Sequence, residues 1–313
     1  MWSIKQPSTI IFGKNSVKEY LFPENCLVIT SKGARSRGWL EYAELSEHEI
    51  FDQVEPNPSI KTTEKIISQF KGHNFTHVVG IGGGSSMDVA KYCAFKMDKS
   101  KIMIPTTFGS GSEVTRISVL KVNGKKQSFH DDGIFADVAI IDSNFINESS
   151  NTIIKNSAID ACAQCTEAYD SKISNPYTKF LCNIAFDLLE EGILTNNHEK
   201  IVLGSLLDGL GFGNSSTTLG HALSYVYSNE GFSHGHALAF TTTIAHQFNN
   251  SKFYQRFKKI VEYYNFEPIH LQQDFVEAAD LIMKDRKHLD NNPIPINHKS
   301  IIKLLKELQN SSP

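Results

Sequence analysis

The first half of the chain alternates short apolar runs with polar or amphipathic stretches. Five runs rich in Val, Ile and other apolar residues have the length and composition of buried strands. They occupy positions 26–30, 49–54, 76–81, 102–105 and 138–142. Strands that alternate with helix-like segments are typical of a mostly parallel α/β sheet.

The pattern changes after a segment rich in Ser and Asn at 147–152. From Ile153 onward, apolar residues recur at spacings of three and four with little clustering of β-branched residues. This periodicity predicts a helical second domain. We therefore expect an α/β domain over residues 1–150 and a helical domain over residues 151–313.

The stretch 75–91, FTHVVGIGGGSSMDVAK, carries the most distinctive local pattern in the first domain. An apolar run enters Gly82, Gly83 and Gly84, and a helix-compatible segment follows Ser85 at once. Glycines permit close approach of the backbone, and free amides at a helix start attract phosphate. The stretch is either a phosphate-binding turn or an ordinary strand-to-helix turn.

Two further polar loops should lie beside this turn. The segments 30–38 and 106–115 also follow predicted strands. In an open parallel sheet the ligand binds outside the carboxyl ends of the strands, so three such loops suggest a nucleotide site. The hydroxyls of Thr106, Thr107 and Ser112 are candidates to hold sugar or nicotinamide amide groups.

In the second domain, Asp160, Gln164 and Glu167 fall at helix angles of about 0°, 40° and −20°, on one polar stripe. The stripe is either an active-site face or a solvated face, and its small and apolar neighbours argue against the second. Cys162 and Cys165 point away from the stripe on the same helical wheel. We interpret them as packed thiols rather than as a metal or redox pair.

Three histidines follow in a segment rich in Gly, Ser and Thr: His221, His234 and His236. Together with a carboxylate of the stripe, they make a divalent metal site plausible. One carboxylate oxygen and two imidazoles would leave an open position, as a metal acting as a Lewis acid requires.

Composition narrows the class of protein. The 313 residues are 40% hydrophobic, and the net charge of −3 gives no reason to expect a nucleic-acid or acidic-membrane partner. The first residues lack an apolar leader pattern, and no run of 18 apolar residues occurs. With five cysteines, an odd and low number, we expect a cytoplasmic protein.

Several motifs resemble the iron-containing (group III) alcohol dehydrogenase family. They appear in the order of that family: GGGSSMDVAK, IPTTFGSGSEVT, ADVAIID, AIDACAQCTEAY, GHALSYVYSNEGFSHGHA and DNNPIPINHKSI. The resemblance spans nearly the whole chain. It implies a Rossmann-like N-terminal nucleotide domain, a helical metal-binding C-terminal domain, a homo-oligomer, and the fold shared with dehydroquinate synthase.

The resemblance also assigns roles to individual positions. It implies that Gln164 stands where relatives usually have a histidine ligand, and an amide oxygen is a poorer ligand than imidazole for a transition metal. The ion, Fe or Zn, is therefore in question. The implied cofactor contacts are Gly82, Gly83, Gly84, Ser85, Asp88, Thr106, Thr107, Ser112 and Lys126, and the implied metal positions are Asp160, Gln164, His221 and His234.

The first loop bears on the choice between NAD(H) and NADP(H). Relatives selective for NAD tend to carry Asp after the first strand, whereas this chain has Ser31 there, with Lys32, Arg35 and Arg37 close behind. Loss of an anion and gain of cations favour NADP(H), with Ser31 and Arg35 as contacts. Alternatively, these basic residues are ordinary solvent-exposed residues of a surface loop and do not bear on the cofactor.

The expected reaction is the reduction of a small aldehyde to a primary alcohol by NAD(P)H. His236 and Asp88 are the catalytic candidates: His236 as a proton relay, although a packed structural histidine is an equal alternative, and Asp88 from a position near the nicotinamide. The loops resemble the branch that reduces phosphonoacetaldehyde to 2-hydroxyethylphosphonate, for which Arg116 and Lys126 would supply cations. Two alternatives stay open: a lyase resembling dehydroquinate synthase, and a nucleotide-binding protein that has lost catalysis.

Overall fold

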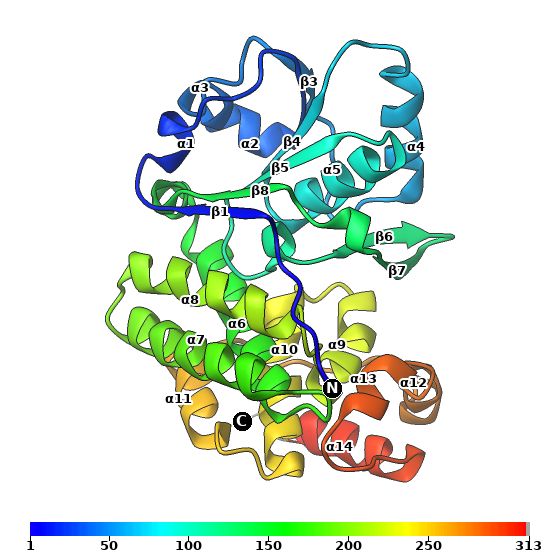
Figure 1. Cartoon of the computed structure of the whole chain (residues 1–313). Helices are drawn as coiled ribbons and strands as arrows, with labels where there is room; N and C mark the ends of the chain where they lie inside the picture. The colour runs from blue at the N-terminus through cyan, green and yellow to red at the C-terminus, as the bar shows by residue number, and fades with distance from the viewer. Residues whose placement is uncertain (311–313) are drawn as a thin grey trace. The chain divides into compact units, whose positions relative to one another are not determined.

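The computed structural model describes residues 1–310, which form two compact units (Figure 1). The first unit runs from Ser3 to Ser150. The second begins at Asn151 and also includes Met1 and Trp2.

Six parallel strands form the central sheet of the first unit, in the order β1-β8-β5-β4-β2-β3. Five of them correspond to the predicted strands, with ends that differ by at most a few residues. All four residues of β2 are buried, as expected for a parallel strand covered on both faces. The strands are β1 (Thr9–Phe12), β2 (Cys26–Ile29), β3 (Glu49–Phe51), β4 (His77–Gly82), β5 (Ser100–Pro105) and β8 (Val138–Ile141).

Three strands were absent from the sequence prediction. β1 is a four-residue edge strand with two exposed ends, so its apolar run, Ile10 to Phe12, is only three residues long, and β7 (Lys125–His130) is almost wholly polar and exposed. β7 pairs with β6 (Ile117–Val122) in an antiparallel hairpin. Its turn, Asn123–Gly124, has positive φ at both residues, which is the usual hairpin signal.

Helices cover the sheet of the first unit. Helices α4 and α5 share one apolar core with β2, β4 and β5. The helices are α1 (Ser16–Glu19), α2 (Lys32–Ser36), α3 (Trp39–Tyr42), α4 (Ile60–Gln69) and α5 (Gly84–Lys96), with 3-10 turns η1 (Ser112–Val114), η2 (Asp132–Ile134) and η3 (Ser143–Glu148).

The direction of the strand order reverses between β2 and β4. The chain leaves β2 for β3 on one side and leaves β4 for β5 on the other. Ligands of open parallel sheets bind at the carboxyl ends of the strands at such a reversal. The Thr30 hydroxyl joins the two strand ends by donating to the Ile81 carbonyl at 2.7 Å. The topology therefore directs attention to the loops after β2 and β4.

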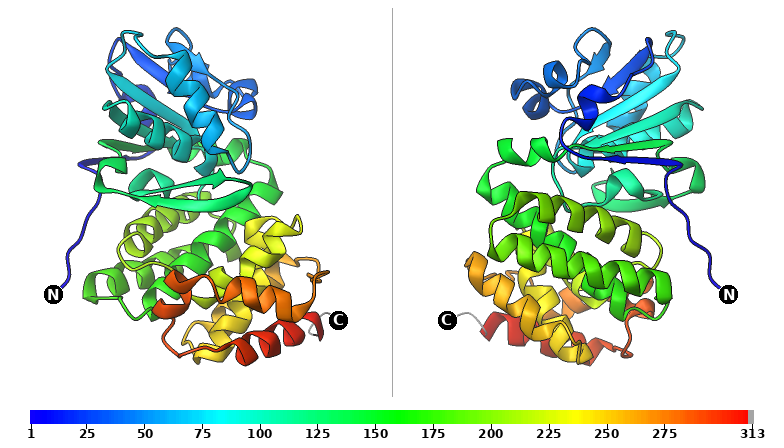
Figure 2. Two further views of the ribbon diagram at one scale, coloured as in Figure 1. Left: turned by 90° about the vertical axis from the view of Figure 1, so that its right-hand side faces the viewer. Right: turned by 60° about the vertical axis from the view of Figure 1, so that its left-hand side comes forward.

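The described part of the second unit is helical, as predicted, and Figure 2 shows it from two further sides. One apolar cluster joins α9, α10, α12 and α14. The helices are α6 (Asn151–Asp170), α7 (Pro176–Leu194), α8 (His198–Phe212), α9 (Leu219–Asn229), α10 (His234–Asn249), α11 (Tyr254–Tyr264), α12 (Phe275–Ile282), α13 (Arg286–Asn291) and α14 (His298–Asn310).

Two further sequence predictions can be compared with these units. The α/β fold class followed by a helical part is confirmed. Cys162 and Cys165 are fully buried free thiols, which confirms their interpretation as packed residues. Within residues 1–310, each helix is too short or too polar to cross a membrane.

Candidate functional site

The glycine turn after β4 leaves very little room beside its backbone. Gly82 has φ +148°, and a Cβ there would lie 2.7 Å from Ser86 Oγ. Added Cβ atoms at Gly83 and Gly84 would lie 3.0 Å from Thr107 Oγ1 and from Ser110 Cβ. Only glycine fits these positions, so the turn packs closely against its neighbours and leads directly into the start of α5, the kind of helix terminus that binds phosphate.

The loop after β5 places a hydroxyl beside this turn. The Thr106 amide donates to the Gly82 carbonyl at 2.9 Å, so the ends of β4 and β5 are joined. Thr106 Oγ1 is buried and bonded to none of the described residues. A buried hydroxyl without a partner costs free energy, so a polar ligand is its natural complement.

Asp88 and Ser112 are engaged inside the unit. Ser112 Oγ donates to one oxygen of Asp88 at 2.6 Å, and the Val119 amide donates to the other at 3.0 Å. The buried Lys91 ammonium lies 3.7 Å from Asp88 and donates to the carbonyls of Ser112 and Thr115. These contacts fix the loop 106–115 against α5. They give Asp88 a structural role and do not support the predicted catalytic one.

Replacing Lys91 by methionine should destabilise the protein by about 3–5 kcal/mol, because Asp88 and the loop carbonyls would lose a buried cation. Urea denaturation measures this effect. Lys96→Met, on the exposed side of the same helix, is the matched control and should change stability by less than about 1 kcal/mol. Equal losses for the two variants would contradict a special role for Lys91.

The loop after β2 carries the residues predicted to choose the cofactor. Ser31 caps α2, since its hydroxyl accepts from the Ala34 amide at 3.3 Å. Arg35 pairs with Asp52 at 2.6 Å. The structure thus places Ser31 and Arg35 at the carboxyl edge of the sheet, although Asp52 offsets the charge of Arg35.

The remaining predicted cations of this unit lie on exposed segments. Arg116 donates to Asp132 at 2.8 Å, so its charge is already paired. Lys126 is exposed on β7, opposite Lys121 in the hairpin. The proposed contacts of Arg116 with a phosphonate and of Lys126 with the cofactor remain predictions.

In the helical unit, three helices bring Asp160, His221 and His234 together. Asp160 lies on α6, His221 on the first turn of α9, and His234 is the first residue of α10. Asp160 Oδ1 lies 3.7 Å from His221 Nε2 and 3.9 Å from His234 Nε2. One ligand atom of each residue lies within 4.8 Å of the others.

This geometry fits a divalent ion. Two donors 2.1 Å from a tetrahedral ion are about 3.4 Å apart, so a small contraction would complete the site. The two separations at Asp160 are too long for hydrogen bonds. His221 Nε2 is buried and bonded to none of the described residues. A buried ring nitrogen aimed at a carboxylate and a second imidazole is what a metal ligand requires.

Gln164, one turn after Asp160 on α6, is turned toward the same carboxylate. Its Nε2 donates to Asp160 Oδ1 at 2.9 Å, and its Oε1 is buried without a bonding partner among the described residues. An amide can exchange the places of its nitrogen and oxygen by rotation. The predicted ligand role of Gln164 therefore stays a prediction that needs this rotation.

Gln164→His should raise the affinity for Zn(II) or Fe(II) by roughly 10- to 100-fold, because imidazole would supply a fourth strong ligand. Competition with a chromophoric chelator measures the affinity. Gln164→Ala is the control for loss of the hydrogen bond to Asp160 and should weaken binding. Unchanged affinity in Gln164→His would mean that α6 is not the ligand helix.

Glu167, the last member of the polar stripe, holds His221 in place. Its carboxylate accepts from His221 Nδ1 at 2.6 Å, from the Thr218 amide at 3.1 Å and from the Gly220 amide at 2.5 Å. Burial alone raises the pKa of Glu167, but the bond from His221 and the backbone donors lower it to about 2. The anion fixes the ring so that Nε2 faces the ligand cluster.

His236 does not join this cluster. Residues two apart on a helix point about 200° from each other, so His236 leaves α10 on the side opposite to His234. Its Nε2 lies 2.5 Å from the Glu267 carbonyl, and its ring packs beside Phe232 and Phe266. These contacts support the structural alternative and argue against the proton relay.

Two aromatic residues beside the cluster were not predicted from the sequence. Tyr225 lies one turn after His221 on α9, and its ring stacks on His234 at a centroid distance of 6.3 Å. His288 stacks on His221 at 6.2 Å, and its Nδ1 bonds Asp285 at 2.6 Å. The spacing from His221 to Tyr225 was a usable signal, whereas nothing local in the sequence connects His288 to the site.

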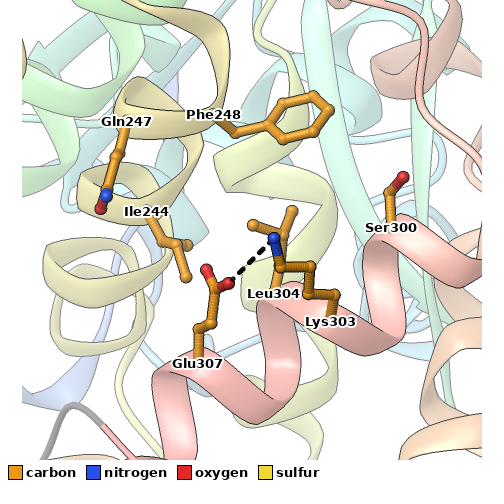
Figure 3. Close-up of a pocket in the computed structure, with 7 residues that line it drawn as sticks. All are labelled: Ile244, Gln247, Phe248, Ser300, Lys303, Leu304 and Glu307. Carbon is orange, nitrogen blue, oxygen red and sulfur yellow. Dashed lines mark ion pairs between the residues drawn. The ribbon is translucent and has the colours of Figure 1, made fainter.

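A pocket of about 330 Å³ lies elsewhere in this unit, between α10 and α14 (Figure 3). It begins at Ile244, ten residues and about 15 Å along α10 from His234. Its lining combines apolar side chains with a Lys303–Glu307 ion pair of 3.5 Å. The pocket is therefore separate from the ligand cluster and offers none of its chemistry.

Comparisons with known proteins agree with the geometry of both units. Residues 7–143 match the family model described as iron-containing alcohol dehydrogenase, and residues 154–280 match the C-terminal model of the Fe-containing alcohol dehydrogenase family. Long-chain-alcohol dehydrogenase 1 of Geobacillus thermodenitrificans is 32% identical over 56% of this chain and 52% of its own length. 4-Hydroxybutyrate dehydrogenase of Clostridium kluyveri is 32% identical over 58% of this chain and 56% of its own length. The chain thus spans about half the length of these curated relatives.

Solved structures share the fold over the whole chain. Sulfoacetaldehyde reductase from Bifidobacterium kashiwanohense, in complex with NAD+, superposes with a TM-score of 0.90 at 23% identity and covers 100% of both chains. An iron-containing alcohol dehydrogenase from Thermotoga maritima gives a TM-score of 0.86 at 23% identity over 99% of this chain and 100% of its own. With two family models matched in order and the ligand cluster in place, the chain belongs to the iron-containing alcohol dehydrogenase family.

Proposed function

We propose that the chain is an NAD(P)H-dependent aldehyde reductase whose divalent ion is held by Asp160, His221 and His234. The observation that carries this proposal is the cluster itself, in which a buried Nε2 of His221 lacks a bonding partner among the described residues and faces a carboxylate and a second imidazole. Its family membership supports the same reaction class.

The protein's own groups would prepare the ligand cluster for this chemistry. Glu167 holds Nδ1 of His221, so that Nε2 remains directed at the ligand position. Gln164 steadies the Asp160 carboxylate through its amide. When bound, a divalent ion would act as a Lewis acid toward the oxygen of a carbonyl.

The glycine turn would bind the cofactor. Amides at the start of α5 would face the pyrophosphate, and the Thr106 hydroxyl would bond the nicotinamide or its ribose. Lys91 and Asp88 would keep the loop 106–115 in the position that this contact needs. When bound there, NAD(P)H would supply the hydride for reduction of a carbonyl to an alcohol, and the accompanying proton would come from solvent.

The substrate class is a small aldehyde, and phosphonoacetaldehyde is the candidate to test first. A structural neighbour is named for an aldehyde with an anionic sulfonate group, and a curated relative is named for 4-hydroxybutyrate. Both names join a short carbon chain to an anionic group. The pairing of Arg116 with Asp132 weakens the case for a dedicated phosphonate contact at that residue. Self-association of the chain remains a prediction.

The proposal is tested by following the absorbance of NADH and NADPH with the metal-loaded protein and a panel of aldehydes. The panel should include phosphonoacetaldehyde, sulfoacetaldehyde, succinic semialdehyde and simple alkyl aldehydes. We expect at least one aldehyde to be reduced, with one alcohol formed for each reduced nicotinamide consumed. Binding of NAD(P)H without turnover of any aldehyde would favour the alternative of lost catalysis.

The lyase alternative would use the same Asp160, His221 and His234 but would regenerate its cofactor in every cycle. Such an enzyme would form product from a polyhydroxylated phosphate ester without net consumption of nicotinamide. Product analysis together with the absorbance record therefore separates the two reactions.

A further inference from the structure

The ends of β2 and β3 are joined at the edge where the strand order reverses. The Thr30 amide donates to the Phe51 carbonyl at 2.8 Å, and the Val54 amide donates to the Thr30 carbonyl at 3.2 Å. Asp52 therefore leaves β3 beside the last residues of β2. The Thr30 hydroxyl also reaches the end of β4, so Asp52 shares one edge of the sheet with the glycine turn.

Two opposite charges meet at this edge. Arg35 Nη1 lies 2.6 Å from Asp52 Oδ2, and the two side chains are 54% and 22% exposed. Ser31, the second residue after β2, uses its hydroxyl to cap α2. Asp52 therefore supplies a carboxylate at the strand edge from the neighbouring strand.

The other arginine of the loop is already engaged. Arg37 Nη1 donates to the Gly33 carbonyl at 3.1 Å, and its guanidinium lies 4.8 Å from the centre of the Trp39 ring. The Arg35 guanidinium is held by a partly exposed ion pair with Asp52, a contact that contributes at most about 1 kcal/mol. Arg35 can therefore exchange Asp52 for another anion with little loss of stability.

A carboxylate and a guanidinium at this position have opposite effects on a dinucleotide. A carboxylate accepts a hydrogen bond from the ribose 2′-hydroxyl and repels a 2′-phosphate, whereas an arginine binds the 2′-phosphate through two parallel hydrogen bonds. When the two groups neutralise each other, neither form of the cofactor is strongly favoured.

We propose that the Arg35–Asp52 pair sets the choice between NAD(H) and NADP(H). Asp52 restrains the binding of the 2′-phosphate, and Arg35 makes that binding possible. The inference rests on the proposed function, because it concerns the cofactor of that reaction. The protein binds both cofactors with affinities within about tenfold of each other. Removal of the Asp52 charge favours NADPH, and removal of the Arg35 charge favours NADH.

The test is a titration of NADPH and NADH, followed by nicotinamide fluorescence at fixed ionic strength, on wild-type protein and single variants. Asp52→Asn should tighten NADPH relative to NADH by roughly tenfold, because one repulsive charge is gone. Arg35→Gln should shift the ratio by roughly tenfold in the other direction. The double variant should return near the wild-type ratio, since the two charges act on one phosphate.

Glu49→Gln is the matched control. Glu49 is an exposed carboxylate at the other end of β3, about 10 Å from Asp52 by the rise of a strand and thus near one Debye length at moderate salt. Its removal should leave the ratio within about twofold of wild type. Added salt should reduce the shifts in the Asp52 and Arg35 variants, because exposed charges are screened.

The outcomes separate the two proposals. If wild-type protein binds dinucleotide but both single variants keep its NADPH to NADH ratio within about twofold, the role of the pair is overturned and the proposed function stands. If wild-type protein binds neither dinucleotide, the proposed function is overturned together with the inference.

Discussion

Asp160→Asn is expected to lower the affinity for a divalent ion by at least about 100-fold and aldehyde reduction by roughly 1000-fold. Asp160 is the carboxylate of the ligand cluster, and it lies 3.7 and 3.9 Å from the two imidazole nitrogens. Asparagine keeps the size of the side chain and removes its charge. Metal content after dialysis and the rate of NAD(P)H oxidation measure the two effects.

The control for this variant is Asp187→Asn. Asp187 is a half-exposed carboxylate on α7 that pairs with Arg256. Its replacement should leave metal content and reductase activity close to wild type, because exposed ion pairs contribute little. If Asp160→Asn keeps its metal and its activity, the ion is bound elsewhere.

Glu167→Gln should destabilise the protein by about 3–5 kcal/mol and also lower metal affinity by roughly 10- to 100-fold. The carboxylate is 1% exposed and accepts from His221 Nδ1 and from three backbone amides. The amide group of glutamine would direct a donor at groups that are themselves donors. Urea denaturation of the metal-free protein separates the loss of stability from the loss of metal.

Glu262→Gln is the comparison for that variant. Glu262 is 66% exposed on α11 and forms an i,i+4 pair with Lys258. We expect a change in unfolding free energy below about 0.5 kcal/mol and unchanged metal affinity. A Glu167→Gln protein as stable as this control, with unaltered metal affinity, would contradict the positioning role of Glu167.

Much of the sheet could be predicted because buried parallel strands are recognisable in the sequence as apolar runs. The run before Gly82 became β4, and the glycines marked the start of α5. The hairpin formed by β6 and β7 could not be found in this way, because Phe129 is the single apolar residue of β7. The usable local signals were its Asn123–Gly124 turn and the Ile, Val and Leu residues of β6.

In the candidate site, too, residues that share a local pattern could be predicted, and residues brought together by tertiary packing could not. Asp160, Gln164 and Glu167 could be grouped because one helix repeats its faces every 3.6 residues. His236 looked equivalent to His234 in the sequence, yet a separation of two residues places it on the other side of α10. His288 comes from a distant segment, and its position beside His221 depends on tertiary packing alone.

The loop after β2 shows a further limit of prediction from the sequence. The sequence supplied the cations after β2 but could not reveal that Asp52 would neutralise one of them. That contact depends on the parallel pairing of β2 with β3, which brings Ile29 opposite Phe51. Charges read along a single loop therefore misjudge the local charge when a neighbouring strand contributes its own residue.

The position of anomalous scattering in a crystal of the Zn(II)- or Fe(II)-loaded protein tests the central claim most directly. The account predicts one peak per chain, about 2.0–2.2 Å from an oxygen of Asp160 and from Nε2 of His221 and of His234. A peak at other residues, or no peak in protein that reduces aldehydes at full rate, would contradict it.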